Sequence, residues 1–309
     1  MSPTAIALVL AAAVAHASWN LFGKQAAATG AAFFIWLVAA CVTVGYLPVV
    51  AIAAIATRPH LAGLNWLFLA GTGVLHSGYF LFLQLGYRLG DLSVAYPVGR
   101  GTGALLAALA GIVLLGERPG PVTGAGIIAI IVGVVAIGLP GRAGQTTDAG
   151  PAADAGPVAD AEPAAVPRAS RTTIGFALAT GAFIACYTIW DKYAVASLHT
   201  EPILQGYAGF PVMAAAFTPI VLRDRQRLAW VWRSQRRQVL GTALLSPLAY
   251  ILVLVALSFT AVSVVAPARE VSVLFGVLLG RRLLGEGNLA RRLAGAAAIV
   301  AGIIAVAIG

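Results

Sequence analysis

Charged residues are scarce in this sequence. Asp, Glu, Lys and Arg make up 10% of its 309 residues, whereas soluble domains contain about 25%. Hydrophobic residues make up 60%, and the mean hydropathy is +0.91. So few charges cannot cover a surface that faces water. The composition therefore disfavours a soluble protein with an oversized core and indicates that lipid surrounds most of the chain.

Motifs for enzyme chemistry are also lacking. Cys41 and Cys186 lie singly within apolar segments, without CxxC or metal-ligand spacing, and are interpreted as small core residues. The GRGTG stretch at 99–103 has no preceding strand and no Lys-Ser/Thr pair, so it does not predict a nucleotide site. Neither HExxH nor a usable Ser/His/Asp grouping occurs. We therefore expect no enzyme activity, no bound metal and no cofactor.

Ten apolar segments have lengths near the ~20 residues that cross ~30 Å of hydrocarbon at 1.5 Å per residue. They are 3–22, 31–56, 64–87, 92–115, 121–139, 173–197, 202–222, 239–259, 262–284 and 290–308. The first also resembles a signal peptide ending at 15–17, but no positive charge precedes it and its apolar run continues past that site. A retained helix is therefore favoured over a cleaved signal.

The composition changes between the fifth and sixth segments. Residues 141–171 are rich in Ala, Pro and Asp and have no apolar periodicity, which is typical of a disordered linker. The predicted organisation is a first five-helix repeat at 1–140, the linker at 141–171, and a second five-helix repeat at 172–309.

The two sets of five segments are related in sequence. LSVAYPVGRGTGALLAALAGIVLLGE at 92–117 recurs as VSVVAPAREVSVLFGVLLGRRLLGE at 262–286. A second match, at a constant offset of 171, pairs His16, Trp19 and Asn20 with Tyr187, Trp190 and Asp191. An odd number of helices per copy inserts the second copy upside down. The sequence predicts an all-α membrane protein with ten transmembrane helices arranged as two inverted five-helix repeats.

The positive charges predict which loops share a side of the membrane. Of the 20 Lys and Arg residues, 15 lie in or beside the loops that follow the odd-numbered segments, and three lie in or beside the even-numbered loops. The positive-inside rule places the odd loops in the cytoplasm and both termini on the opposite side. The segment 223–237, interleaved with Trp230 and Trp232, is predicted to be a loop that contacts lipid headgroups. The net charge of +9 lacks the mixed basic-aromatic platforms of nucleic-acid binding, so we expect no nucleic-acid partner.

Three stretches, taken together, resemble a known family. They are HASWNLFGK at 16–24, DLSVAYPVGRG at 91–101 followed by LLGERP, and SVVAPARE at 263–270 followed by LLGE. In order and duplication they resemble the EamA-type ten-helix members of the drug/metabolite transporter superfamily. The resemblance implies a central cavity lined by the first four helices of each repeat, and gradient-driven movement of small organic solutes. Family members have both termini in the cytoplasm, opposite to the charge distribution here, so the absolute orientation stays open.

Polar and aromatic residues within the apolar segments are the candidates for solute binding and coupling. They are His16, Trp19, Asn20, His76, Tyr79, Tyr96, Arg100, Tyr187, Trp190, Asp191, Tyr250, Arg269 and Glu270. Asp191 is the candidate proton carrier, and the alternative is a structural pair with Lys192. For the histidines, Asn20 and the aromatic residues, the alternative is interhelical hydrogen bonding or packing.

Matched positions in the two repeats suggest further roles. Arg100 and Glu270 each lie three residues after a matched proline, so a two-fold axis brings them face to face, as a solute and proton site or as a permanent ion pair. Pro97 and Pro267 are candidate hinges or static kinks, because each removes a helix hydrogen bond. Glu117 and Glu286 are interpreted as structural residues that mark the end of the fourth helix in each repeat, each near the positive end of the next helix.

The predicted function is that of a secondary active transporter in the cell (inner) membrane. It moves a small organic metabolite, amino-acid-like or drug-like, by alternating access coupled to protons or another gradient. The expected partners are this solute, the proton and the lipid bilayer. The alternative is a flippase or scramblase of a lipid-linked substrate. The sequence does not predict the substrate, the direction of transport, the coupling ion or the oligomeric state.

Overall fold

The computed structural model describes residues 1–26, 30–89, 92–138, 171–272 and 289–308. The apolar segments form helices, because a backbone surrounded by lipid must satisfy its N–H and C=O groups within the segment. The first half contains α1 (Pro3–Ala26), α2 (Ala31–Gly45), α3 (Leu47–Thr57), α4 (Gly63–Leu89), α5 (Leu92–Leu114) and α6 (Pro121–Gly138). The second half contains α7 (Arg171–Ala196), α8 (Pro202–Val221), α9 (Arg225–Phe259), α10 (Val262–Ala268) and α12 (Leu289–Ile308).

The second predicted span is bent. It consists of α2 and α3, which meet at 45° at Tyr46. Pro48 in the first turn of α3 causes this break, because it has no N–H to continue the helix of α2 and its ring clashes with the preceding turn. In the described part of the chain, five helices are long and apolar enough to cross a membrane, and the bent pair makes six.

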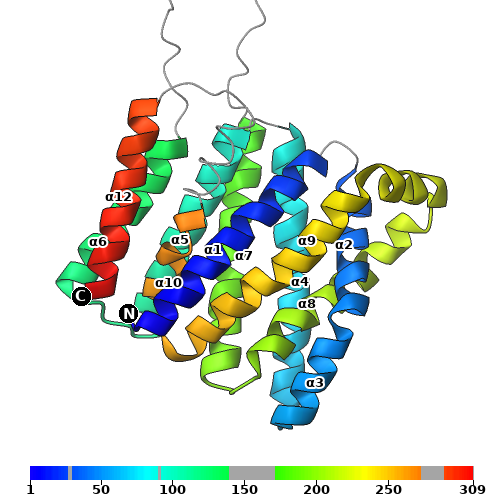
Figure 1. Ribbon diagram of the computed structural model, residues 1–309, viewed down its shortest axis with the longest axis horizontal. Helices are drawn as coiled ribbons and strands as arrows, with labels where there is room; N and C mark the ends of the chain where they lie inside the picture. Colours follow the sequence, from blue (N-terminus) through cyan, green and yellow to red (C-terminus); the bar gives the residue numbers. More distant parts are fainter. Residues whose placement is uncertain (27–29, 90–91, 139–170, 273–288, 309) are drawn as a thin grey trace, which may run out of the picture.

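Helices of one repeat pair with helices of the other (Figure 1). α1 packs on α9, α4 on α7, α2 on α8 and α6 on α12. In the two repeats, α1 is equivalent to α7 and α4 is equivalent to α9. Exchanging the repeats therefore converts the pair α1–α9 into the pair α7–α4. The pairs α2–α8 and α6–α12 each join equivalent helices, so the exchange leaves them unchanged. An inverted repeat about an axis in the membrane plane produces this pattern. It agrees with the predicted all-α membrane fold of two inverted repeats.

The two ends of the bundle carry different loops. Figure 1 shows both chain termini at one end, together with the connections from α7 to α8 and from α9 to α10. The arginine-rich start of α9 lies at the other end. Lys and Arg are therefore concentrated at the end away from the termini, as the loop count predicts.

The prediction of a loop at 223–237 was wrong for most of that segment. Helix α9 begins at Arg225, where the side chain of Asp224 caps the helix by accepting a hydrogen bond from the N–H of Arg227 (2.8 Å). The first part of α9 ends at a kink, where Gln235 has non-helical angles (φ −124°, ψ 17°). A cap followed by good helix formers, with no Gly or Pro before the kink, explains the helix.

The predicted fourth span of the second repeat is interrupted. Helix α10 covers only Val262–Ala268 and contains Pro267. A turn at Arg269 and Glu270 follows it, and helical residues resume at Val271 and Ser272. The matched helix α5 continues past the equivalent Pro97. The side chains of Tyr96 and Pro97, the residues 273–288 that include Glu286, and the predicted linker up to residue 170 lie outside the described residues.

The turn between α9 and α10 is held by charged side chains from both repeats. The carboxylate of Glu117 accepts hydrogen bonds from the N–H groups of Val262 and Ser263, both at 2.7 Å. Glu117 therefore caps α10 of the other repeat, and the expectation that it lies at the start of the next helix was wrong. Lys192 donates to the carbonyls of Leu257 (2.8 Å) and Thr260 (2.9 Å) at the end of α9.

Helices α6 and α12 approach closely because glycines face each other. A methyl group added at Gly126 would lie 2.6 Å from the carbonyl oxygen of Gly302, and one at Gly133 would lie 2.6 Å from that of Gly295. Small residues at such an interface let helix backbones pack closely in a membrane. Gly124, on the same helix, has open space around it.

We predict opposite effects for alanine at two glycines of α6. Gly126→Ala destabilises the protein by about 1–3 kcal/mol, because the added methyl group pushes α6 away from α12. Gly124→Ala leaves the stability unchanged or raises it by up to about 1 kcal/mol, because alanine favours the helix and meets no neighbour. Thermal unfolding of the two purified variants in the same detergent checks this. Equal unfolding midpoints would contradict the close packing of α6 and α12.

Candidate functional site

A cavity lies between the two repeats. Its walls come from α1 and α4 of the first repeat and from α7, α8 and α9 of the second. It is lined by His16, Trp19, Thr72, His76, Tyr79, Phe80, Tyr187, Gln205, Gly206, Gly209, Phe210, Met213, Ser246 and Tyr250. Its empty volume is about 470 Å³, counting the open mouth.

Aromatic rings form much of the cavity wall. The ring of His76 stacks on Tyr187 with 4.2 Å between centroids. The ring of Tyr250 packs edge-on against His76 with 4.8 Å between centroids. Tyr79 contacts both His76 (6.4 Å) and Tyr187 (5.5 Å) edge-on. His76 Nδ1 lies 2.9 Å from the carbonyl oxygen of Thr72, which fixes the ring. The cavity therefore presents flat, rigid surfaces from both repeats to a bound molecule.

A carboxylate lies directly behind this wall. Asp191 on α7 is fully buried, and its Oδ1 accepts a hydrogen bond from Gln205 Nε2 at 2.8 Å. Its Oδ2 accepts from Thr72 Oγ1 at 3.0 Å and from the Tyr250 hydroxyl. All three donors are neutral, and all three line the cavity. Lys192 is not a partner of this acid, because it donates to carbonyls at the end of α9.

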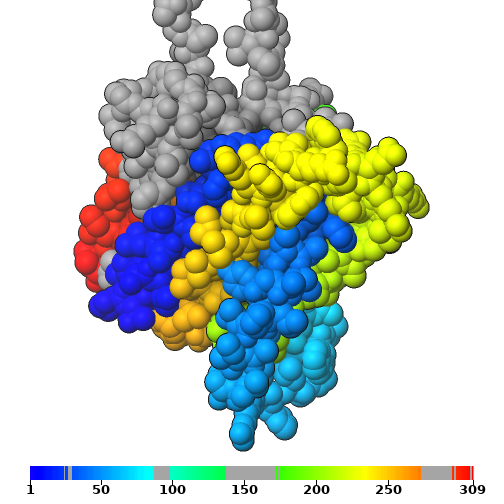
Figure 2. Space-filling model, turned by 45° about the vertical axis from the view of Figure 1, so that its right-hand side comes forward, coloured from blue at the N-terminus to red at the C-terminus, as the bar shows by residue number. Residues whose placement is uncertain are grey.

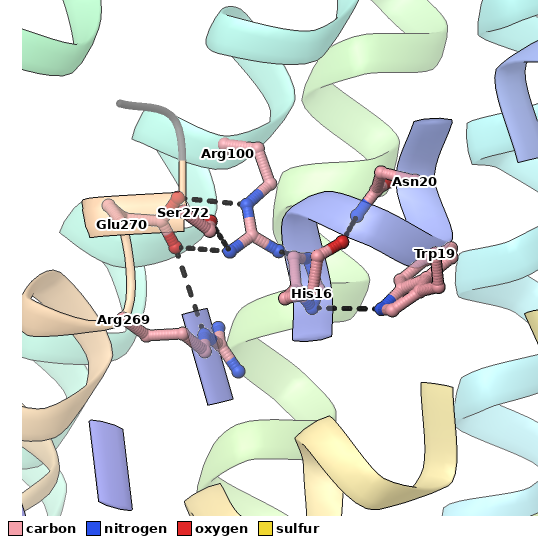
Figure 3. Close-up of polar contacts among 7 residues, drawn as sticks. All are labelled: His16, Trp19, Asn20, Arg100, Arg269, Glu270 and Ser272. Carbon is pink, nitrogen blue, oxygen red and sulfur yellow. Dashed lines mark hydrogen bonds and ion pairs between the residues drawn. The ribbon is translucent and has the colours of Figure 1, made fainter. Parts of the chain in front are cut away.

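A second group of charges lies where the matched repeats meet (Figure 3). Arg100 on α5 forms two hydrogen bonds with Glu270, from Nε to Oε2 at 2.8 Å and from Nη2 to Oε1 at 2.9 Å. Both side chains are 1% exposed. The expected meeting of Arg100 and Glu270 is therefore present, as a bidentate ion pair between the two repeats.

His16 connects this ion pair to the cavity. Its Nε2 lies 2.8 Å from Arg100 Nη1, and its Nδ1 accepts a hydrogen bond from Trp19 Nε1 at 3.2 Å. Both His16 and Trp19 line the cavity, whereas Arg100 and Glu270 do not. Asn20 is buried, donates to the carbonyl oxygen of His16 (2.8 Å), and also lies outside the lining. A molecule in the cavity would contact the ion pair only through the imidazole.

Arg269 is a buried cation with few contacts. Its side chain is 3% exposed, and its Nε lies 3.8 Å from Glu270 Oε1, too far for a hydrogen bond. Within the described residues, its Nε and Nη2 have no hydrogen-bond partner. The two buried arginines and the two buried acids, Asp191 and Glu270, have formal charges that cancel. Near-neutrality lowers the cost of placing these groups in a membrane.

Outside the cavity lining, the start of α4 contacts the end of α7 and the turn that follows it, and we name these contacts the closure. Trp190 stacks on Phe68 of α4 with 4.1 Å between centroids, and its Nε1 donates to the Phe68 carbonyl oxygen at 2.9 Å. Asn65 of α4 donates to Thr200 Oγ1 (2.9 Å) and to the carbonyl oxygen of Leu198 (3.3 Å). Trp190 was expected to bind solute, but the structure places it in this closure and outside the cavity lining.

Sequence reasoning missed two residues that hold Asp191. Thr72 lies four residues before His76, so helical spacing places both on one face of α4 and was a usable signal. Gln205 is the only side-chain amide in the apolar segment 202–222, a second usable signal. Phe80, Phe210 and Met213 also line the cavity, but apolar residues in an apolar helix give no such signal.

Comparison with known proteins agrees with this architecture. The model of the EamA-like transporter family matches residues 3–139 and 171–308. Among solved structures, 20 chains match. One, described as "Crystal structure of protein", has a TM-score of 0.68 at 15% identity and covers 100% of this chain and 98% of its own. That likeness supports the fold alone. No curated protein matches the chain.

The family model covers both halves of the chain and leaves only the segment between them unmatched. It describes transporters, in agreement with the expectation that the protein is not an enzyme. The match in each half agrees with the duplication in the sequence and with the pairing of helices between the repeats. The chain is a multi-pass membrane transporter that belongs to the EamA-like transporter family.

Proposed function

We propose that this transporter moves a small organic solute, amino-acid-like or drug-like, by alternating access, with the solute bound in the cavity between the repeats. The observation that carries the proposal is a cavity with walls from both repeats and a buried carboxylate behind it. Rocking one repeat against the other would move the opening of such a site from one side of the membrane to the other. The closure at Trp190 and Asn65 is the set of contacts that would open.

Asp191 is the proposed proton carrier. Its carboxylate has three neutral donors, and no cationic side chain bonds to it among the described residues. An acid without a cationic partner can become neutral by protonation at little electrostatic cost in a membrane interior. Because Gln205, Thr72 and Tyr250 also line the cavity, a bound solute contacts the donors that hold the carboxylate. Solute binding and proton binding are thereby linked.

The Arg100–Glu270 pair has a different proposed role. Both carboxylate oxygens are engaged, and opening the pair would separate two opposite charges that are both buried. Removing one partner of such a pair costs about 3–5 kcal/mol. We propose that the pair holds the repeats together throughout transport, as a pivot beside the interrupted helix at Pro267. Proton exchange by Glu270, expected as one possibility from the sequence, is then unnecessary.

The proposed location is the cell (inner) membrane. The arginine-rich end of the bundle faces the cytoplasm, and both termini lie on the opposite side. A reporter fused to the last residue tests this orientation. Reporter activity on the cytoplasmic side would reverse it and would agree with the arrangement implied by the family resemblance.

We predict that Asp191→Asn separates solute binding from coupling. Purified protein in sealed vesicles is screened against amino acids, nucleosides and cationic drugs, with and without an imposed pH gradient. For a transported solute, Asp191→Asn should keep exchange between labelled and unlabelled solute, because the cavity shape is preserved. It should reduce gradient-driven accumulation to the level without a gradient, because the amide cannot carry a proton.

The matched control is Asp224→Asn, which changes an exposed acid at the start of α9. Asparagine also caps helices well, so this variant should retain both exchange and accumulation. Full accumulation by Asp191→Asn would contradict a proton carrier at this position. Loss of both exchange and accumulation with intact folding would place Asp191 in solute binding instead. Movement of lipid analogues without any solute transport would favour the alternative of a flippase.

A double-mutant cycle tests the ion pair. We predict that Glu270→Gln lowers the stability by about 3–5 kcal/mol, because Arg100 stays buried without the negative charge that neutralises it. The double variant Arg100→Met/Glu270→Met should recover most of this loss and keep solute exchange. Thermal unfolding and exchange in vesicles are measured for these two variants and for the single variants Arg100→Met and Glu270→Met, which complete the cycle. Additive losses would contradict a direct pair, and a stable Glu270→Gln that loses only accumulation would make Glu270 the proton carrier.

A further inference from the structure

The part of α9 before its kink is a separate basic element, which we name the basic surface helix (225–234). Figure 1 shows it crossing the end of the bundle, at a steep angle to the helices that span it. Figure 2 shows it as a yellow surface above the blue of α2, on the outside of the molecule. This element takes no part in the cavity or the buried ion pair.

Its exposed face is strongly positive. Exposed arginines on and beside it are Arg223, Arg225, Arg227, Arg233, Arg236 and Arg237. The only acid in this stretch is Asp224, whose side chain is used as the cap of α9. Within the part of the chain that the structure describes, no carboxylate forms an ion pair with these arginines. The positive charge is therefore free to attract an external anion.

Aromatic side chains accompany this charge. Trp230 is 54% exposed and Trp232 is 37% exposed. At 100° per residue they lie on opposite flanks of the helix, on either side of the buried Val231. Exposed Leu240 follows just beyond the kink. Tryptophan is enriched where hydrocarbon meets the headgroups, because its ring is apolar with one polar N–H.

The opposite face fixes the helix to the bundle. Val231 is fully buried and belongs to the main core, and Leu228, three residues earlier, packs against the same core. Arg227 lies over the ring of Phe33 on α2, with 5.4 Å from its guanidinium carbon to the ring centroid. The helix is therefore held in place on the bundle by Val231, Leu228 and Arg227, while its other arginines are exposed.

We infer that the basic surface helix binds the headgroups of anionic phospholipids in the leaflet on its side of the membrane. An amphipathic element with arginines outward and tryptophans at its flanks, at the end of a membrane bundle, matches the chemistry of that surface. A phospholipid offers a negative headgroup to the arginines and a hydrocarbon boundary to the two tryptophans and Leu240. The positive-inside rule places this end at the cytoplasmic leaflet, whose surface is negative.

This binding has a structural consequence for the cavity. The basic surface helix continues through the kink at Gln235 into the part of α9 that carries Ser246 and Tyr250. Headgroups bound to the arginines would fix the outer end of a helix whose other end holds the cavity wall. Lipid binding by the basic surface helix does not depend on which solute is transported.

Lipid retention by purified protein tests the inference. Protein is exchanged into detergent with equal amounts of phosphatidylglycerol and phosphatidylcholine, and native mass spectrometry measures the retained lipids. Wild-type protein should retain phosphatidylglycerol preferentially. Each arginine near the surface contributes about fivefold in affinity, the equivalent of about 1 kcal/mol. Arg233→Gln should therefore weaken retention about fivefold, and Arg225/Arg233/Arg236/Arg237→Gln should abolish the preference.

Two controls make the result specific. Replacing the same four arginines with lysine preserves the charge and should preserve the preference. Arg58→Gln/Arg118→Gln removes exposed charges at the opposite end of the bundle and should leave the preference unchanged. Thermal unfolding in detergent verifies that each variant is folded. Equal retention of the two lipids by wild type, or an unchanged preference in the folded glutamine variant, would overturn the inference.

Discussion

A polar group in a helix surrounded by lipid has no water to bond with, and this constraint organises the whole molecule. Each buried charge must find its partners on other helices of the protein. Asp191 obtains three donors from α4, α8 and α9, and Arg100 obtains Glu270 from the opposite repeat. Helices that were separate apolar segments are thereby held around a common interior. The donors to Asp191 lie in the cavity wall, and the Arg100–Glu270 pair lies outside it.

The two groups of buried charges are built differently, and this difference supports separate roles. Arg100 and Glu270 form two short hydrogen bonds with each other, and this pairing stabilises the charged form of both side chains. Asp191 is held by neutral hydroxyl and amide groups that a solute can also contact. The Arg100–Glu270 pair resists movement of one repeat against the other. The hydrogen bonds to Asp191 can change when the repeats move. A transporter needs both.

The repeats are related in architecture but not in chemistry. Asp191 in the second repeat corresponds to Asn20 in the first, and Glu270 corresponds to Arg100. Trp19 lines the cavity, while its counterpart Trp190 lies in the closure. These differences break the symmetry that two identical inverted copies would have. An acid at this position in one repeat only gives the two faces of the membrane different relations to the cavity.

The sequence by itself determined the class of the fold and one key contact. Lengths of apolar segments specify spanning helices, because only helices satisfy a backbone in lipid. The offset between the copies made Arg100 and Glu270 equivalent, and a two-fold axis brings equivalent positions together where they lie close to the axis. Those arguments use only composition and spacing, so one sequence is enough for them.

Tertiary structure decided the contacts that no repeat relates. Thr72, Gln205 and Tyr250 reach Asp191 from three helices, and Glu117 caps α10 of the other repeat. Partners this far apart in the chain are chosen by how helices tilt and pack, which a periodic pattern does not encode. The helical start of α9 escaped prediction for a similar reason, since the packing of Val231 on the core holds a charged segment that composition alone assigns to a loop.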